Sequence, residues 1–187
     1  MAARALAVAM VLAGLLGAQT RYTISTIAGA LGSSDGVPAI DATLNRVSSI
    51  VPGSSGNLFL ADEGTNLILE ITANGVMSTY AGGGPTDGPN NASGVPALEA
   101  SIFSPRHLTR DEEGNLYFAE PSTIRRISTK GIVDTIAGSG QLLFPNSPVP
   151  QNVPATSAAL AGSGPIFPEA SGGFLRSEEH TSELQSL

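Results

Sequence analysis

Residues 113–119 read Glu-Gly-Asn-Leu-Tyr-Phe-Ala, and this stretch decides the fold because it recurs along the chain. An earlier copy at 56–61 reads Gly-Asn-Leu-Phe-Leu-Ala, and a later one at 172–175 reads Gly-Gly-Phe-Leu. The glycines that open the three copies lie at 56, 114 and 172, a constant step of 58 positions. A second marker, Val-Pro-Ala, begins at 37, 95 and 153 and repeats the same step. A fixed period of this order is typical of propellers and solenoids.

Each full repeat contains four segments that pattern as short strands separated by turns. The expected strands are residues 48–51, 57–61, 67–72 and 76–81 in the first repeat, and 106–110, 115–119, 124–128 and 132–137 in the second. The pairs Asn-Gly at 74–75 and Lys-Gly at 130–131 supply the positive φ that tight hairpins require. One such sheet cannot bury both faces alone, so neighbouring sheets must stack. We therefore predict an all-β chain, a β-propeller fragment with two full four-stranded blades and part of a third.

Two further segments complete the predicted propeller. Residues 22–28 resemble the last strand of each later repeat, although the other strands of that unit do not precede them. We predict that this segment is an N-terminal closing strand, which pairs into the last blade and removes an exposed sheet edge. Ala42 and Leu44 recur as Ala100 and Ile102, and these small and branched side chains are expected to fill the gap between blades.

The two ends of the chain pattern differently from the repeats. Residues 1–18 combine Arg4, an apolar run and the small pair Gly17-Ala18, which is typical of a secretory signal peptide; a buried N-terminal helix is the alternative. Residues 176–187 read as a translated sequencing adapter, with a native charged tail as the alternative. The expected organisation is a signal peptide at 1–18, a partial propeller at 19–175 and an adapter-derived tail at 176–187. The chain would then be a secreted or periplasmic fragment.

The composition narrows the class of partner. The formal net charge is −7 and the longest basic run is the pair Arg125-Arg126, so we expect neither nucleic acid nor an anionic membrane as partner. The apolar run near the N-terminus is too short to span a bilayer, which needs roughly twenty residues. The chain has no cysteine, which excludes disulfides and thiolate chemistry and is consistent with a bacterial exported protein.

The repeat pattern also resembles a known family. Residues 56–62, then Asn66 and Ile68, a glycine turn and Thr-Tyr-Ala-Gly at 79–82 are similar to the NHL repeat. The segment Asp-Gly-Val-Pro-Ala at 35–39 is similar to the variant in bacterial exported proteins and teneurin-like ectodomains. The resemblance covers roughly residues 22–175 and implies a propeller, commonly of six blades. The second copy departs from it at 120–122, where Glu-Pro-Ser stands. A shared fold does not imply a shared function.

Two acidic residues, Asp62 and Glu120, end the second strand of each repeat. One interpretation makes these carboxylates binding groups that face the propeller axis, as metal ligands or acid–base groups. The favoured interpretation is structural: Asp62 caps the following turn through its side chain.

The pair Arg106-His107 opens the inner strand of the second blade, where the other repeats have Ser-Ser at 48–49 and Gly-Pro at 164–165. Variation at one repeat position is typical of a specific ligand site, so Arg106 and His107 are candidate binding residues. Arg106 would hold an anionic group by a bidentate contact, and the alternative is an ion pair with Asp111 or Glu112. His107 would act as a base or metal ligand, and the alternative is an ordinary hydrogen-bonded histidine.

The sequence contains no phosphate loop, zinc spacing or nucleophile elbow. We therefore predict no catalytic residue, metal or cofactor, and favour a binding or scaffold module that recognises a protein or glycan through its blade loops. The alternative is an enzyme, a metal-dependent propeller lactonase or lyase with its site in the central channel. The short basic stretch that Arg125, Arg126 and Lys130 form is interpreted as a solvated outer face.

Overall fold

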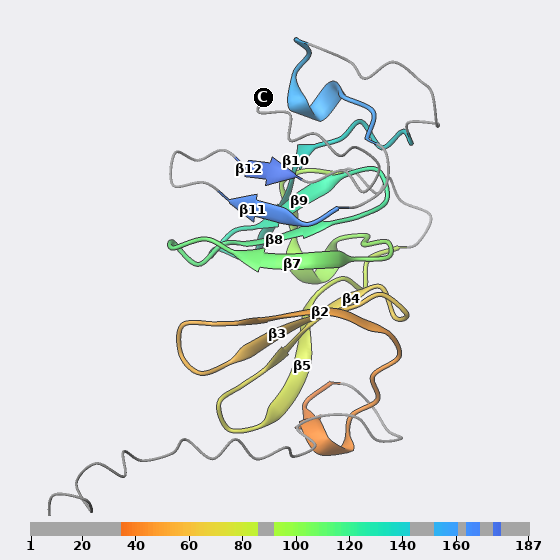
Figure 1. Ribbon diagram of the computed structural model, residues 1–187. Coiled ribbons are helices and arrows are strands. Elements are labelled where there is room, and N and C mark those ends of the chain that lie inside the picture. The colour runs from red at the N-terminus through yellow and green to blue at the C-terminus, as the bar shows by residue number, and fades with distance from the viewer. Residues whose placement is uncertain (1–34, 86–91, 143–151, 161–163, 169–173, 177–187) are drawn as a thin grey trace, which may run out of the picture.

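A computed structural model describes residues 35–85, 92–142, 152–160, 164–168 and 174–176. The described chain forms two antiparallel sheets that stack one on the other, followed by a short hairpin against the second sheet (Figure 1). This arrangement confirms the all-β prediction of two full blades and part of a third. The predicted signal peptide and closing strand lie outside the described residues, and so does the tail except Arg176.

The strands of the first sheet are β1 (Val37–Pro38), β2 (Val47–Pro52), β3 (Leu58–Asp62), β4 (Leu67–Ile71) and β5 (Val76–Ala81). Those of the second are β6 (Val95–Pro96), β7 (Arg106–Arg110), β8 (Leu116–Ala119), β9 (Ile124–Ile127) and β10 (Ile132–Ala137). The hairpin pairs β11 (Ile166–Pro168) with β12 (Phe174–Arg176). Three-residue 3₁₀ turns follow the Val-Pro segments: η1 (Ala39–Asp41), η2 (Ala97–Glu99) and η3 (Ala155–Ser157).

Each full sheet has five strands rather than the predicted four. The order is β1-β5-β4-β3-β2 in the first sheet and β6-β10-β9-β8-β7 in the second. The extra strand is the Val-Pro segment, whose Val37 lies opposite Met77 at the edge of the sheet. Gly36, with φ 68°, turns the chain so that its N–H donates to the carbonyl of Met77 at 2.8 Å. The sequence did not indicate this strand, because two residues show no strand periodicity.

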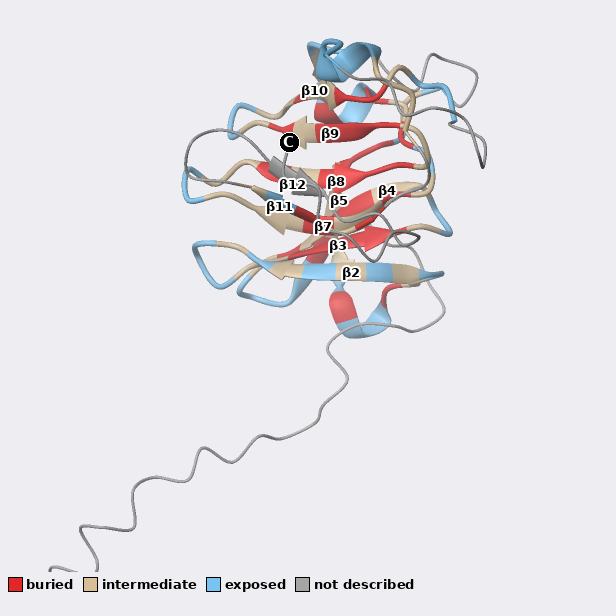
Figure 2. Cartoon of the chain, turned by 45° about the horizontal axis from the view of Figure 1, so that its top comes forward, coloured by how far each residue is buried: buried red, intermediate tan, exposed pale blue. Residues whose placement is uncertain are grey.

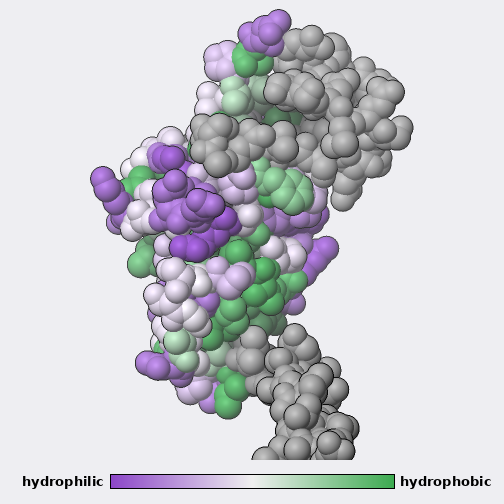
Figure 3. All heavy atoms as spheres, turned by 60° about the vertical axis from the view of Figure 1, so that its left-hand side comes forward, coloured by the Kyte–Doolittle hydropathy of each residue, from purple (hydrophilic) through white to green (hydrophobic). Residues whose placement is uncertain are grey.

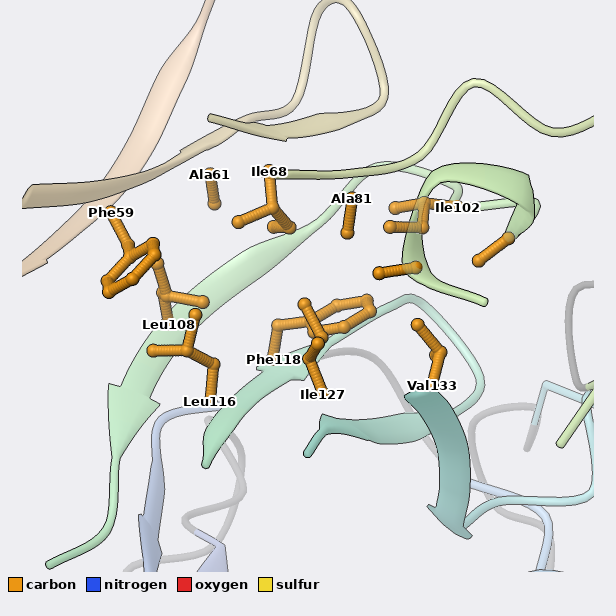
Figure 4. Close-up of a cluster of buried hydrophobic side chains, with 12 residues drawn as sticks. Phe59, Ala61, Ile68, Ala81, Ile102, Leu108, Leu116, Phe118, Ile127 and Val133 are labelled. Atoms are coloured by element: carbon orange, nitrogen blue, oxygen red, sulfur yellow. The ribbon is translucent and has the colours of Figure 1, made fainter. Parts of the chain in front are cut away.

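The main core lies between the two sheets. Figure 2 shows the buried residues running along the stacked strands, and Figure 4 shows Phe59 and Ile68 pointing from the first sheet toward Leu108 and Phe118 of the second. Ala100 and Ile102 are buried in the same cluster, which confirms that this pair fills the gap between blades. A smaller cluster, with Ile124 and Ile166, joins the second sheet to the hairpin in the same way.

The sheets approach most closely along their first long strands, β2 and β7. The hydroxyl of Ser48 donates to the carbonyl of Pro105 at 2.8 Å, and the N–H of Leu108 donates to the Ser49 hydroxyl at 3.0 Å. At the opposite edge, η2 separates the sheets and binds the end of β5, because the N–H of Gly82 donates to the carbonyl of Ala97 at 2.9 Å. The stack is therefore tight along β2 and β7 and wider near β5.

The other face of the first sheet carries a third apolar cluster, in which Leu60, Leu69 and Met77 are buried and Leu44 and Leu58 only partly so. Ile50, on β2, is exposed. Figure 3 shows apolar surface on the lower half of the described molecule, where the first sheet lies. No helix within the described ranges has the length and apolar character needed to cross a membrane.

Candidate functional site

Asp62, at the end of β3, is fully buried and acts as a local organiser of the backbone. Its carboxylate accepts the N–H groups of Asn45 and Arg46, each at 2.9 Å, which fixes the chain entering β2. It also accepts the N–H groups of Gly64 at 3.1 Å and Thr65 at 3.4 Å. The side chain thus caps the turn that follows it, as the structural interpretation expected.

Glu120 occupies the equivalent place in the second blade and is also buried. Its carboxylate accepts the Phe103 N–H at 2.9 Å and the Thr123 hydroxyl at 2.6 Å. Arg125 lies 3.6 Å from it and is likewise buried. Burial raises the pKa of Glu120, while the charge of Arg125 and these hydrogen bonds act in the opposite direction. Glu120 and Arg125 therefore form a buried ion pair, and these contacts of Glu120 are all to described residues of the same chain.

The interpretation of Arg125 as part of a solvated face was wrong. Its guanidinium donates to the carbonyls of Ser101 at 2.6 Å and Ala92 at 2.9 Å, so it ties two loop segments to the blade. Burial lowers the pKa of Arg125, although the charge of Glu120 opposes this shift. Arg126 is half-buried and forms an ion pair with Asp134, at 3.0 Å. Sequence alone does not separate the two arginines, because strand alternation places one on each face.

Arg106 lies at the start of β7 but does not pair with Asp111 or Glu112. Its Nε donates to Glu63 at 2.9 Å, and its Nη2 forms a second bond to the same carboxylate. Glu63 belongs to the turn after β3 of the first blade, so this ion pair crosses between blades. The Ser104 hydroxyl adds a bond to Glu63 at 2.8 Å, and Arg46 Nε lies 3.4 Å from it. Hydrogen bonding from Arg106 lowers the pKa of Glu63, so the carboxylate is ionised at neutral pH.

We call the group of Arg46, Glu63, Asn66, Ser104, Arg106 and His107 the inter-blade rim. Glu63 is its centre, since its side chain is 9% exposed whereas that of Arg46 is 70% exposed. Two guanidinium groups therefore flank one carboxylate.

The backbone of the rim is unusual. Asn66, Ser104 and His107 have φ of 61°, 49° and 50°, and Asn152 is the only other described non-glycine residue with positive φ. Such conformations are disfavoured by about 1–2 kcal/mol and cluster at functional positions. The Ser104 N–H donates to the Asn66 side chain at 2.7 Å, which holds two of these residues together across the blades. His107 stands where β7 and β8 slip in register, between Arg106 and Thr109.

The structure thus groups Arg106 with His107. Asp62 is buried beside this group, where its carboxylate accepts the N–H of Arg46, and Glu120 is buried in the second blade. The sequence analysis missed Glu63 and Arg46 because neither recurs in the next repeat, where Pro121 and Ser104 stand. The sequence did contain a signal for Glu63, because it follows Asp62 directly and is replaced by Pro121 in the next repeat. No cluster of three or more His, Cys, Asp or Glu side chains suited to a metal occurs within the described ranges.

Comparison with known proteins identifies the type of repeat. Residues 69–156 match the family model of the Teneurin NHL domain. The chain is 33% identical to human Teneurin-4 over 99 residues, which is 47% of this chain and 4% of that protein. It is 41% identical to chicken Teneurin-1 over 58 residues, 31% of this chain and 2% of that protein. The predicted resemblance to NHL repeats is confirmed, although the chain spans only a small part of these relatives.

Similar solved structures include a structural genomics protein from Bacteroides thetaiotaomicron, with a TM-score of 0.49 and 21% identity, covering 64% of this chain and 29% of that one. A catalytically inactive virginiamycin B lyase from Staphylococcus aureus, solved with quinupristin, has a TM-score of 0.38 and 17% identity and covers 68% of this chain and 33% of that one.

Proposed function

We propose that this chain, as part of an NHL-repeat β-propeller, is a binding module that holds a protein or glycan on the inter-blade rim and its adjoining loops. The family supports a protein-binding scaffold as the broad class of function. The inter-blade rim is the single observation that supports a specific binding site, because its residues differ between repeats. Arg106 and His107 stand where the first blade has serines, and Arg46 and Glu63 are also specific to one repeat.

The geometry of the rim supports binding rather than mere packing. A blade contact needs only apolar surface and backbone bonds, which the core between the sheets already provides. The rim adds exposed arginine side chains and three residues with unfavourable φ, neither of which increases burial. Unfavourable backbone conformations persist where the surrounding structure enforces them, and they mark candidate sites of function.

The module would act outside the cytoplasm, as an exported protein that is secreted or periplasmic. This part of the proposal rests on residues 1–18, whose basic start, apolar run and small residues are typical of a signal peptide. A fusion of these residues to a reporter that is active only after export would test it. A reporter that stays in the cytoplasm and keeps residues 1–18 would contradict it.

The rim is tested by His107→Gly, which removes the side chain where glycine suits the backbone. Asn152→Gly is the matched control, because Asn152 also has positive φ, of 57°, but lies outside the rim. Both variants should remain folded, because glycine suits the backbone at both positions. Only His107→Gly should weaken binding to a ligand selected from protein and glycan arrays, by about tenfold. Equal binding by both variants would overturn the assignment of the rim.

A further inference from the structure

We infer that the inter-blade rim recognises a single carboxylate on a protein ligand, an acidic side chain flanked by apolar ones. This inference rests on the proposed function, since it specifies the ligand of the same rim. It is carried by the two arginines around Glu63 and by the exposed side chain of Phe103 next to Ser104.

The donors of Arg106 are only partly used by the protein. The guanidinium group has five N–H donors in a planar fork. Nε and Nη2 bind Glu63, and no bond of Nη1 to another described residue is formed. Within the part of the chain that the structure describes, the edge that Nη1 and Nη2 share therefore carries no acceptor, and a second carboxylate would match its two-pronged geometry. Glu63 keeps this edge in place because it holds the other side of the fork.

Arg46 supplies the second positive group. It is 70% exposed, and its Nε lies 3.4 Å from Glu63, a looser contact than those of Arg106. Glu63 offsets one of the two guanidinium groups, so the side chains of Arg46, Glu63 and Arg106 together carry one positive charge, beside the buried carboxylate of Asp62. A singly charged carboxylate balances this charge, whereas a phosphate would exceed it. The chain as a whole carries −7, which disfavours polyanionic ligands such as nucleic acids or uronic-acid glycans.

Phe103 extends the rim with an apolar contact. Its N–H is held by the buried Glu120 at 2.9 Å, so the backbone is fixed while the side chain remains exposed. Phe103 directly precedes Ser104 of the rim in the chain, and aromatic residues and arginine are both enriched at protein interfaces. In a ligand segment with an acidic residue next to an apolar one, the carboxylate would bind the arginines and the apolar side chain would pack on Phe103.

The test uses the full chain and a short peptide with one Glu between two Leu, compared with the same peptide carrying Gln. Surface plasmon resonance should show binding of the Glu peptide at least about tenfold tighter than the Gln peptide, weakened further at high salt. Arg46→Gln should reduce the affinity for the Glu peptide by about fivefold, and Arg106→Lys by about tenfold, because lysine keeps a charge near Glu63 but lacks the fork. Lys130→Gln removes an equal charge from an exposed hairpin elsewhere and should bind as the parent does.

Three outcomes would overturn the inference. They are no difference between the Glu and Gln peptides, unchanged affinity in Arg46→Gln and Arg106→Lys, or binding of an oligogalacturonate in place of the peptide. Each of these outcomes leaves the proposed function standing if His107→Gly still loses binding to its array ligand. The rim would then bind a ligand, but not through a single carboxylate.

Discussion

Ile50 and Leu108 occupy the same place on β2 and β7, 58 positions apart, yet Leu108 is 7% exposed and Ile50 is 54% exposed. Ile166, one further repeat along, is 3% exposed. The difference follows from the neighbours, since the first sheet covers Leu108 and the second covers Ile166. Burial of the side chain at this repeat position therefore depends on the sheet that precedes it.

This relationship predicts unequal effects of truncation. Leu108→Ala should lower the free energy of unfolding by about 3 kcal/mol, because it leaves a cavity in the core between the sheets. Ile50→Ala should change it by less than about 1 kcal/mol in the described arrangement. Chemical denaturation of both variants would measure the difference. A large loss in Ile50→Ala would instead indicate that another part of the protein covers that face, as the predicted ring closure requires.

The buried pair of Glu120 and Arg125 predicts a coupled effect. Glu120→Gln leaves the charge of Arg125 buried without its partner and should destabilise the chain by about 3–5 kcal/mol. The double variant Glu120→Gln with Arg125→Leu removes that charge and places leucine where the first blade has Leu67. It should be more stable than Glu120→Gln alone. A double-mutant cycle by urea denaturation checks this, and simple additivity of the two single losses would contradict it.

Two glycines with similar φ predict different tolerances. Gly138 has φ 92°, and a Cβ there would lie 2.2 Å from the carbonyl oxygen of Ser122. Gly131 has φ 71°, and nothing lies within 4 Å of its Cβ position. Gly131→Ala should cost about 1 kcal/mol through its backbone conformation alone. Gly138→Ala should cost roughly 3 kcal/mol, since backbone atoms must also move. Equal melting temperatures for the two variants would show that this close approach is unimportant.

The acidic side chains predict loss of stability in acid. Burial acts to raise the pKa of Asp111, but hydrogen bonds from Asn115 and Tyr117 hold it below the ordinary value. The pKa of Asp134 is also lowered, first by its hydrogen bond from Arg126. The unfolded chain then takes up protons at higher pH than the folded chain does. The stability that these groups provide should be complete above their ordinary pKa, about 4, and decline as the pH falls through their lowered values.

Asp111→Asn provides the control for this pH dependence. The amide cannot ionise, so the variant should lose stability at pH 7 and show a shallower decline in acid than the parent chain. Melting temperatures recorded across the acid range would reveal the slope. A slope identical to that of the parent would show that the hydrogen bonds to Asp111 do not favour its charged form.

Most of the strand framework could be predicted from the sequence. The strands at 76–81, 106–110 and 132–137 were predicted with their observed bounds, because glycine turns and alternating apolar residues define them. The Val-Pro strands were missed, since a two-residue strand depends on a distant partner. The direction of a carboxylate or guanidinium group is also set by tertiary neighbours, so the burial of Arg125 and the partner of Arg106 were predicted wrongly.

The close contacts of Ser48 and Ser49 on one side and the η2 spacer on the other give the two described blades the form of a wedge. The taper of that wedge sets an angle, and the angle sets how many blades complete a circle. Gly84 has no space for a side chain, because a Cβ would lie 2.2 Å from the carbonyl oxygen of Glu99, so the spacer has a fixed thickness. In this pair of blades the taper is thus defined by two hydroxyl groups at the narrow side and one short turn at the broad side.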